Sequence, residues 1–328
     1  MTPAPEEVAR LRRDLDSLAG PEARLGIAVS GGPDSLALLL LAGAGRPGQI
    51  EAATVDHALR PGSRAEAEMV ASLCARLGVP HAILTTEWAD KPSTGIQERA
   101  RAMRYKLLAD WARTAGLGAL VTAHHCDDQA ETVLMRLARG SGVKGLAGMR
   151  PLSTVPGTNL PLLRPLLGWR RSELEQVCAD AGLEPAADPS NHDQQFERVR
   201  VRRALADAHW LDAPAIARSA ANLAMADSAL HWATTQVWDR DVIASDREIL
   251  FKPNGVPPEI RRRIVRRAVL KLAREGSAGE LRGGELDRLL AALRSGGQAT
   301  LRGVLCRSGE AWTFIPAPNR TRPVDKSR

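Results

Sequence analysis

The chain has 328 residues, of which 44% are hydrophobic and 25% charged, and its formal net charge at pH 7 is +7. This length and composition predict about two globular domains and exclude a disordered chain. No run approaches the roughly 20 apolar residues that cross a bilayer, the N-terminus lacks the apolar core of a signal peptide, and the four cysteines form no CxxC pair. We therefore expect a cytoplasmic protein with free thiols and no membrane association.

Short apolar segments alternate with helical patterns through the first half of the chain. The predicted strands are 25–29, 50–55, 81–86 and 119–123, and the predicted helices are 34–42, 63–77, 96–114, 127–139 and 170–181. Ser63, with Glu66 three residues later, predicts a capping box at the start of one helix. The alternation is typical of βαβ units, so we predict an α/β fold with a Rossmann-like parallel sheet that binds its ligand at the carboxyl ends of the strands.

The pattern changes after about residue 210. Helices are predicted at 215–238, 258–274 and 281–294, and two strands at 299–306 and 310–315 are joined by a hairpin turn. We therefore divide the chain into three parts. Residues 1–210 are predicted to form a catalytic domain, and residues 211–316 a smaller and mainly helical domain that ends in a β-hairpin. Residues 317–328 are predicted to be a disordered tail.

The positive charge is concentrated in the C-terminal part. Residues 195–328 carry 24 Lys and Arg against 15 Asp and Glu, a net charge of +9, whereas residues 1–194 carry 21 against 23, a net charge of −2. Any single basic run is ordinarily a solvated face. Two such runs in one half of the chain favour a polyanionic partner such as RNA, so we assign the basic part to tRNA binding.

The strongest chemical signal lies between the first predicted strand and the first predicted helix after it. It is the segment Ser30-Gly31-Gly32-Pro33-Asp34-Ser35. Two glycines allow a sharp turn, and a helix N-terminus offers free N–H groups and a positive dipole end, so the segment predicts a phosphate cradle. An acidic residue fits an anion site if a cation intervenes, which makes Asp34 a candidate Mg²⁺ ligand. The alternative is a plain strand–turn–helix junction capped by Asp34 or Ser35.

This segment resembles the PP-loop of the ATP pyrophosphatases, and other segments narrow the resemblance. They are the runs Val55–Arg60, Gly95–Tyr105, Thr122–Thr132, Arg139–Gly142, Arg164–Leu167 and Asp188–Asn191. Together, in this order, they resemble the tRNA(Ile)-lysidine synthase family over roughly residues 20–205. The resemblance implies the use of ATP with Mg²⁺ to adenylate O2 of cytidine 34 in a tRNA(Ile) with a CAU anticodon. Free L-lysine then displaces AMP, which changes codon reading from AUG to AUA and charging from Met to Ile.

The resemblance also assigns roles to individual residues. Asp34 and Asp128 are the implied catalytic residues, and ATP binding is implied for the PP-loop together with Asp56 and His57. Asp128 and Glu131 are the implied lysine-binding pair. The residues implied to bind tRNA are Arg101, Arg104, Arg198 and Arg202.

Some of these residues make chemical sense by themselves. Asp128 and Glu131 are three positions apart at the start of a helix, so both carboxylates face one side, where they could hold Mg²⁺ or an ammonium group. Helix capping is the alternative. His124 and His125 favour nucleotide or substrate contact over zinc. The alternative for Arg101 and Arg104, which share a helix face with Glu98, is a set of surface ion pairs.

One departure from the family pattern is Val199, which stands between Arg198 and Arg200 where the family has Asn. The alternation of Arg and Val there is also compatible with an exposed strand. Two alternative functions stay open, a different PP-loop enzyme such as a tRNA thiolase and a non-catalytic RNA-binding protein. The sequence does not determine the exact lysine contacts or the discrimination against tRNA(Met). It also does not determine the oligomeric state, for which a homodimer is one option.

Overall fold

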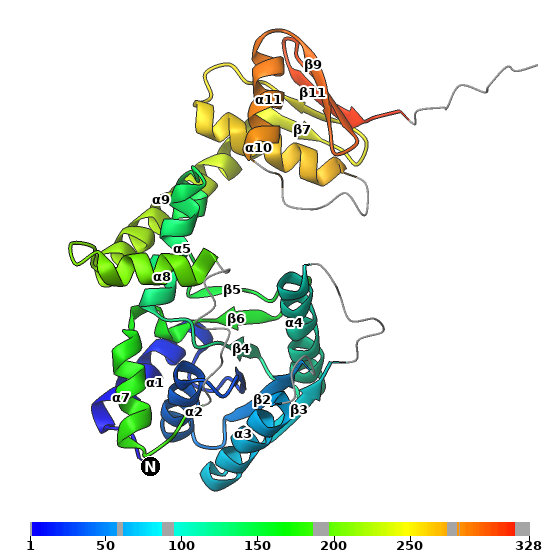
Figure 1. Ribbon diagram of the computed structural model, residues 1–328. Coiled ribbons are helices and arrows are strands. Elements are labelled where there is room, and N and C mark those ends of the chain that lie inside the picture. Colours follow the sequence, from blue (N-terminus) through cyan, green and yellow to red (C-terminus); the bar gives the residue numbers. More distant parts are fainter. Residues whose placement is uncertain are drawn as a thin grey trace, which may run out of the picture. The chain divides into compact units, whose positions relative to one another are not determined.

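The computed structural model describes residues 2–57, 62–86, 95–185, 197–273, 281 and 283–318. The chain forms two compact units, Met1–Ala224 and Met225–Arg328, and the division lies within the long helix α9 (Ala213–Asp241) (Figure 1). The boundary predicted near residue 210 lies just before this helix. The division between the units falls inside the helix, where an uninterrupted helical pattern gives no sign of it in the sequence. The run Asp188–Asn191 and residues 319–328 of the predicted tail lie outside the described residues.

The first unit is built on a six-stranded sheet in the order β3-β2-β1-β4-β6-β5. Its strands are β1 (Leu25–Ala28), β2 (Ile50–Asp56), β3 (His81–Thr85), β4 (Ala119–Val121), β5 (Leu152–Thr154) and β6 (Pro161–Leu163). All neighbouring pairs are parallel except β5 with β6, which pair antiparallel at one edge. The predicted α/β fold with a mainly parallel sheet is confirmed, while the short β5 and β6 carry too little pattern to be recognised in the sequence.

Helices cover both faces of this sheet (Figure 1). The described helices of the first unit that precede α9 are α1 (Pro5–Ala19), α2 (Pro33–Gly45), α3 (Ser63–Leu77), α4 (Ile96–Thr114), α5 (Cys126–Ala138), α6 (Val143–Leu146), the 3₁₀ turn η1 (Pro165–Gly168), α7 (Arg171–Asp180) and α8 (Glu197–Asp207). One core joins α1, α2, α3 and α7 to the sheet, and a second core joins α4 to it. Ala52 belongs to the first core and Ala53 to the second, because successive strand residues point to opposite faces.

The start of α3 differs from the prediction of a capping box. The N-cap residue is Gly62, which has no side-chain cap, and Ser63 is the first helical residue. The Ser63 hydroxyl donates instead to Oδ1 of Asp56 at 2.6 Å. The side chain therefore connects the helix to the end of β2, across the loop that joins them, and the capping-box motif does not predict this contact.

The described residues of the second unit form the C-terminal part of α9, two further helices and an antiparallel sheet in the order β7-β8-β11-β10-β9. The elements after α9 are β7 (Val242–Ala244), β8 (Ile249–Phe251), α10 (Pro258–Leu272), α11 (Gly283–Arg294), β9 (Gln298–Leu301), β10 (Val304–Arg307) and β11 (Trp312–Pro316). The predicted hairpin is confirmed as β10 and β11. The predicted strand 299–306, however, is two strands, because Arg302 and Gly303 both have positive φ and turn the chain. No helix in the described part of the chain is long and apolar enough to cross a membrane.

Candidate functional site

The loop between β1 and α2 has the geometry of an anion site. Gly31 has a φ of +84°, a left-handed conformation that glycine adopts without strain. Ser35 Oγ accepts from the backbone N–H of Ser30 at 3.1 Å and donates to the carbonyl of Gly32 at 3.0 Å. These bonds fix the loop against the first turn of α2, where backbone N–H groups lack acceptors within the helix. A helix N-terminus presented in this way binds phosphate groups in many proteins.

The two carboxylate oxygens of Asp34, in the first turn of α2, have different surroundings. Oδ2 lies 3.6 Å from Nε2 of His125, whereas Oδ1 is buried and has no hydrogen-bond partner. A buried carboxylate oxygen is unfavourable unless a donor or a cation satisfies it. The described residues contain no group of three or more His, Cys, Asp or Glu that could hold a metal ion. The unsatisfied Oδ1 of Asp34 could hold Mg²⁺, an ion that usually binds through one or two carboxylates together with substrate phosphates.

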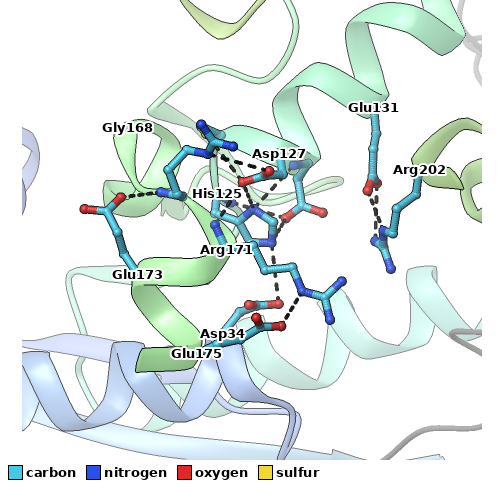
Figure 2. Close-up of polar contacts among 12 residues, drawn as sticks. Asp34, His125, Asp127, Glu131, Gly168, Arg171, Glu173, Glu175 and Arg202 are labelled. Atoms are coloured by element: carbon cyan, nitrogen blue, oxygen red, sulfur yellow. Dashed lines mark hydrogen bonds and ion pairs between the residues drawn. The ribbon is translucent and has the colours of Figure 1, made fainter. Parts of the chain in front are cut away.

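His125 is a buried residue at the N-cap of α5 and lies among three carboxylates. Its Nδ1 is 3.5 Å from Asp127, and its Nε2 is 3.6 Å from Asp34 and 3.5 Å from Asp128. Burial lowers the pKa of His125, but the carboxylates of Asp127, Asp34 and Asp128 outweigh burial and raise it to about 10. The imidazolium thus holds the acidic groups of α2 and α5 together (Figure 2).

Asp127 connects this cluster to α7. Its Oδ2 accepts from the backbone N–H of Arg171 at 2.9 Å, so the side chain satisfies an unpaired donor at the start of that helix. Burial raises the pKa of Asp127, yet the hydrogen bonds from His125 and from the Arg171 N–H outweigh burial and hold the pKa well below its ordinary value. Asp127 is therefore a charged structural partner of His125.

Two arginines of α8 bind two of the three acids of α5. Arg198 contacts Asp128 Oδ1 at 2.9 Å and Glu131 Oε2 at 2.6 Å, while Arg202 contacts Glu131 Oε1 at 2.6 Å. Figure 2 shows Glu131 facing Arg202. Only 2% of the Glu131 side chain is exposed, against 15% for Asp128. Arg198 to Arg202 are helical, so the alternative of an exposed strand is wrong, and Val199 lies within the helix.

A second group of arginines lies around Tyr105 of α4. The guanidinium groups of Arg101 and Arg104 lie 5.1 and 5.4 Å from the centre of the Tyr105 ring, and Arg101 donates to its hydroxyl at 3.3 Å. His124 is near these cations. Burial, followed by Arg164, Arg104, Arg198 and Arg101, lowers the pKa of His124 well below its ordinary value. His124 is therefore a neutral imidazole, in contrast to its neighbour His125.

A cavity of about 660 Å³ lies between the acidic and basic groups, at the carboxyl ends of β1, β2 and β4. This is the edge of a parallel sheet at which ligands bind. Of the predicted site residues, those that line the cavity are Ser30, Gly32, Asp34, Ser35, His57, Arg101, Arg104, Asp128 and Arg198. Those that do not line it are Gly31, Pro33, Asp56, Glu131 and Arg202.

Three features of the site have no signal in the sequence. The ion pairs between α5 and α8 join residues about 70 positions apart. The contact of His125 with Asp34 likewise forms only because the ends of β1 and β4 lie side by side in the sheet. Arg164 belongs to a recognised family segment, but only the structure shows that its side chain is buried beside the cavity residues Arg101 and His124.

Comparison with known proteins gives a consistent result. Residues 6–209 match the family model of the PP-loop domain. The tRNA(Ile)-lysidine synthase of Novosphingobium aromaticivorans is 49% identical over 313 residues, which cover 94% of each chain. The tRNA(Ile)-lysidine synthase of Zymomonas mobilis is 44% identical over 303 residues, covering 92% of this chain and 91% of the relative.

Among solved structures, a U34-tRNA thiolase from Methanococcus maripaludis superposes with a TM-score of 0.54. The match covers 66% of this chain and 77% of the thiolase, with 17% sequence identity. At this identity the similarity shows a shared fold and nothing about the reaction.

Proposed function

Because the chain belongs to the tRNA(Ile)-lysidine synthase family, we propose that its cavity carries out both steps of lysidine formation on tRNA(Ile) with a CAU anticodon. The chain is an ATP-dependent ligase that modifies tRNA. In the first step, O2 of cytidine 34 attacks the α-phosphorus of ATP and pyrophosphate leaves. In the second, the ε-amine of L-lysine attacks C2, the bond from C2 to O2 breaks, and AMP leaves. The modified anticodon reads AUA, and the tRNA is charged with Ile.

The PP-loop is the proposed site for the phosphates of ATP. Ser30, Gly32 and Ser35 line the cavity beside the N-terminus of α2, where N–H groups can bind the departing pyrophosphate. Asp34 would hold Mg²⁺ through its buried Oδ1. When bound, the ion neutralises negative charge on the phosphate oxygens. An Asp34→Asn variant should therefore need at least tenfold more Mg²⁺ for half-maximal ATP binding, and an unchanged Mg²⁺ dependence would contradict this role.

Asp128 is the proposed contact for the attacking lysine. Its carboxylate lines the cavity with the PP-loop. The ε-amine has an ordinary pKa of about 10.4, so it arrives as a cation and must lose a proton before it attacks. A carboxylate there can first bind the ammonium group and then accept its proton. Glu131 is less suited to direct contact, because it does not line the cavity and only 2% of its side chain is exposed.

Arg101 and Arg104 are the proposed tRNA contacts within the first unit, since both line the cavity and neither pairs with an acid in the described part of the chain. Arg198 and Arg202 are ion-paired, so we propose that they chiefly orient Asp128 and Glu131. The basic C-terminal part is the proposed site for the tRNA backbone. A cytoplasmic location is a further prediction.

The observation that carries the proposal is that Asp34 and Asp128 line one cavity with the serines of the PP-loop. The test is to incubate the protein with ATP, labelled lysine and bulk bacterial tRNA and to measure label in RNA. Asp128→Asn should abolish most lysine-dependent AMP release while ATP still binds. Wild-type protein that transfers no label, or transfers labelled sulfur instead, would refute the proposal.

The thiols argue against the alternative of a tRNA thiolase that works through its own cysteines. All four cysteines are buried and free. Burial raises the pKa of Cys74, Cys126 and Cys306 to about 12 and that of Cys178 to about 11. Since the thiolate is the reactive form, none of these side chains is a good nucleophile near neutral pH.

A further inference from the structure

Arg164 is a buried cation without an acidic partner in the described part of the chain. It directly follows β6, and 9% of the residue is exposed. Its Nη1 donates to the carbonyl of Arg150 and to the hydroxyl of Ser153, both at 2.9 Å, while its buried Nε has no acceptor. Both of these acceptors are electrically neutral.

A second buried arginine in the same unit, Arg46, has the acidic partner that Arg164 lacks among the described residues. Arg46 is 2% exposed and also has a buried Nε without an acceptor, but it forms an ion pair with Asp16. Burial of a charge is costly unless an opposite charge compensates it. Arg46 has this compensation within the fold, whereas Arg164 has none among the residues that the structure describes.

The surroundings of Arg164 contain no negative charge from an acidic side chain in the described part of the chain. Burial lowers the pKa of its guanidinium group, Tyr105 raises it in part through a hydrogen bond, and Arg101 lowers it. Arg101 and Arg104, which line the cavity, likewise have no acidic partner among the described residues. We call Arg101, Arg104, Arg164 and the neutral His124 the basic wall. Arg101, Arg104 and His124 of this wall line the same cavity as Asp34 and Asp128.

We propose that Arg164 is a positioning residue whose buried, uncompensated charge makes the basic wall a binding surface for phosphate oxygens of a substrate. The inference rests on the proposed function for the identity of the substrates. The phosphate group has two sources, the triphosphate of ATP and a phosphodiester of the tRNA. Arg164 acts on either through the field that it adds behind Arg101 and Arg104, because it does not itself line the cavity.

The test compares Arg164→Gln with Arg164→Lys, which keeps the charge. Dissociation constants are measured for ATP, for adenosine and for tRNA, each alone, at two salt concentrations. Arg164→Gln should weaken the binding of ATP or tRNA about tenfold and change that of adenosine less than twofold, and Arg164→Lys should restore most of the loss. A loss confined to ATP identifies the triphosphate, and a loss confined to tRNA, with a shallower salt dependence, identifies the phosphodiester.

The control is Arg46→Gln, which removes another buried guanidinium group from the same unit. It should lower thermal stability and leave the ratio of the ATP and adenosine dissociation constants unchanged. Equal weakening of all three ligands by Arg164→Gln, or of none, would overturn the proposal. If Arg164→Gln does not fold, Arg101→Gln at an exposed position of the same wall gives a second test, and unchanged affinity for both ATP and tRNA would overturn it. These binding measurements do not depend on lysine transfer, so their failure is distinct from failure of the proposed function.

Discussion

Replacing Glu131 by Gln should destabilise the first unit, because Glu131 is the buried carboxylate that holds two arginines. The change removes one negative charge that Arg198 and Arg202 each approach at 2.6 Å. Loss of one partner of a buried ion pair costs about 3–5 kcal/mol. The arginine side chains are 38% and 34% exposed, so water can solvate them in part. We therefore expect a loss of about 2–3 kcal/mol, near or below the lower end of that range.

Thermal unfolding measures this loss directly. For a unit of this size, 1 kcal/mol corresponds to about 2–4 °C in Tm, so the predicted decrease is roughly 4–12 °C. The matched control is Glu175→Gln, which breaks the exposed pair with Arg171 at 2.8 Å and should cost about 0–1 kcal/mol. Equal decreases in the two variants would refute the reasoning. An unchanged Tm with a raised KM for lysine would instead assign Glu131 to lysine binding.

Three further predictions follow from the charges and thiols of the molecule. Carboxylates raise the pKa of His125 from 6.5 to about 10 in the folded state, so its stabilising effect is complete below pH 6.5 and is lost as the pH rises through 10. The difference in unfolding free energy between wild type and His125→Gln, measured without divalent cations, should therefore shrink from pH 6.5 to pH 10, and a constant difference would contradict the ion cluster. Alkylating reagents at pH 8 should leave the native enzyme active, because its thiols are buried and protonated; rapid inactivation with label on a cysteine would show otherwise. Replacing Arg261 and Lys271 of α10 by Gln should weaken tRNA binding, reduce its salt slope by about 0.9 per lost phosphate contact and spare ATP binding; equal loss of both ligands would argue against a tRNA surface there.

The basic C-terminal part illustrates how far a charge count can be used. Its net charge of +9 follows from the sequence, but several arginines of α10 have partners within the second unit. Arg263 pairs with Asp227 and Glu259, and Arg267 lies 4.1 Å from the centre of the Trp238 ring. The total charge therefore overstates the number of arginines that are free to contact a phosphate backbone.

Much of the first unit could be predicted because local patterns decide it. A buried parallel strand is a short apolar run, and a helix that packs on the sheet repeats its apolar residues about every three to four positions. The strands β1 to β4 and the helices between them can therefore be predicted from the sequence. The PP-loop is also local, since Gly31, Gly32 and the serines lie within one turn. The reaction was inferred from the resemblance to a known family, because a pattern of hydrophobic residues carries no information about the chemistry.

The sequence by itself thus determined four strands of the first sheet, the phosphate loop and the family. Only the tertiary structure decided which charges meet. It brought His125 against Asp34, paired the acids of α5 with the arginines of α8, and left Arg164 buried without an acid among the described residues. Coulomb energy depends on the distance between charges and on their exposure to water, and neither quantity is encoded in the spacing of residues along the chain.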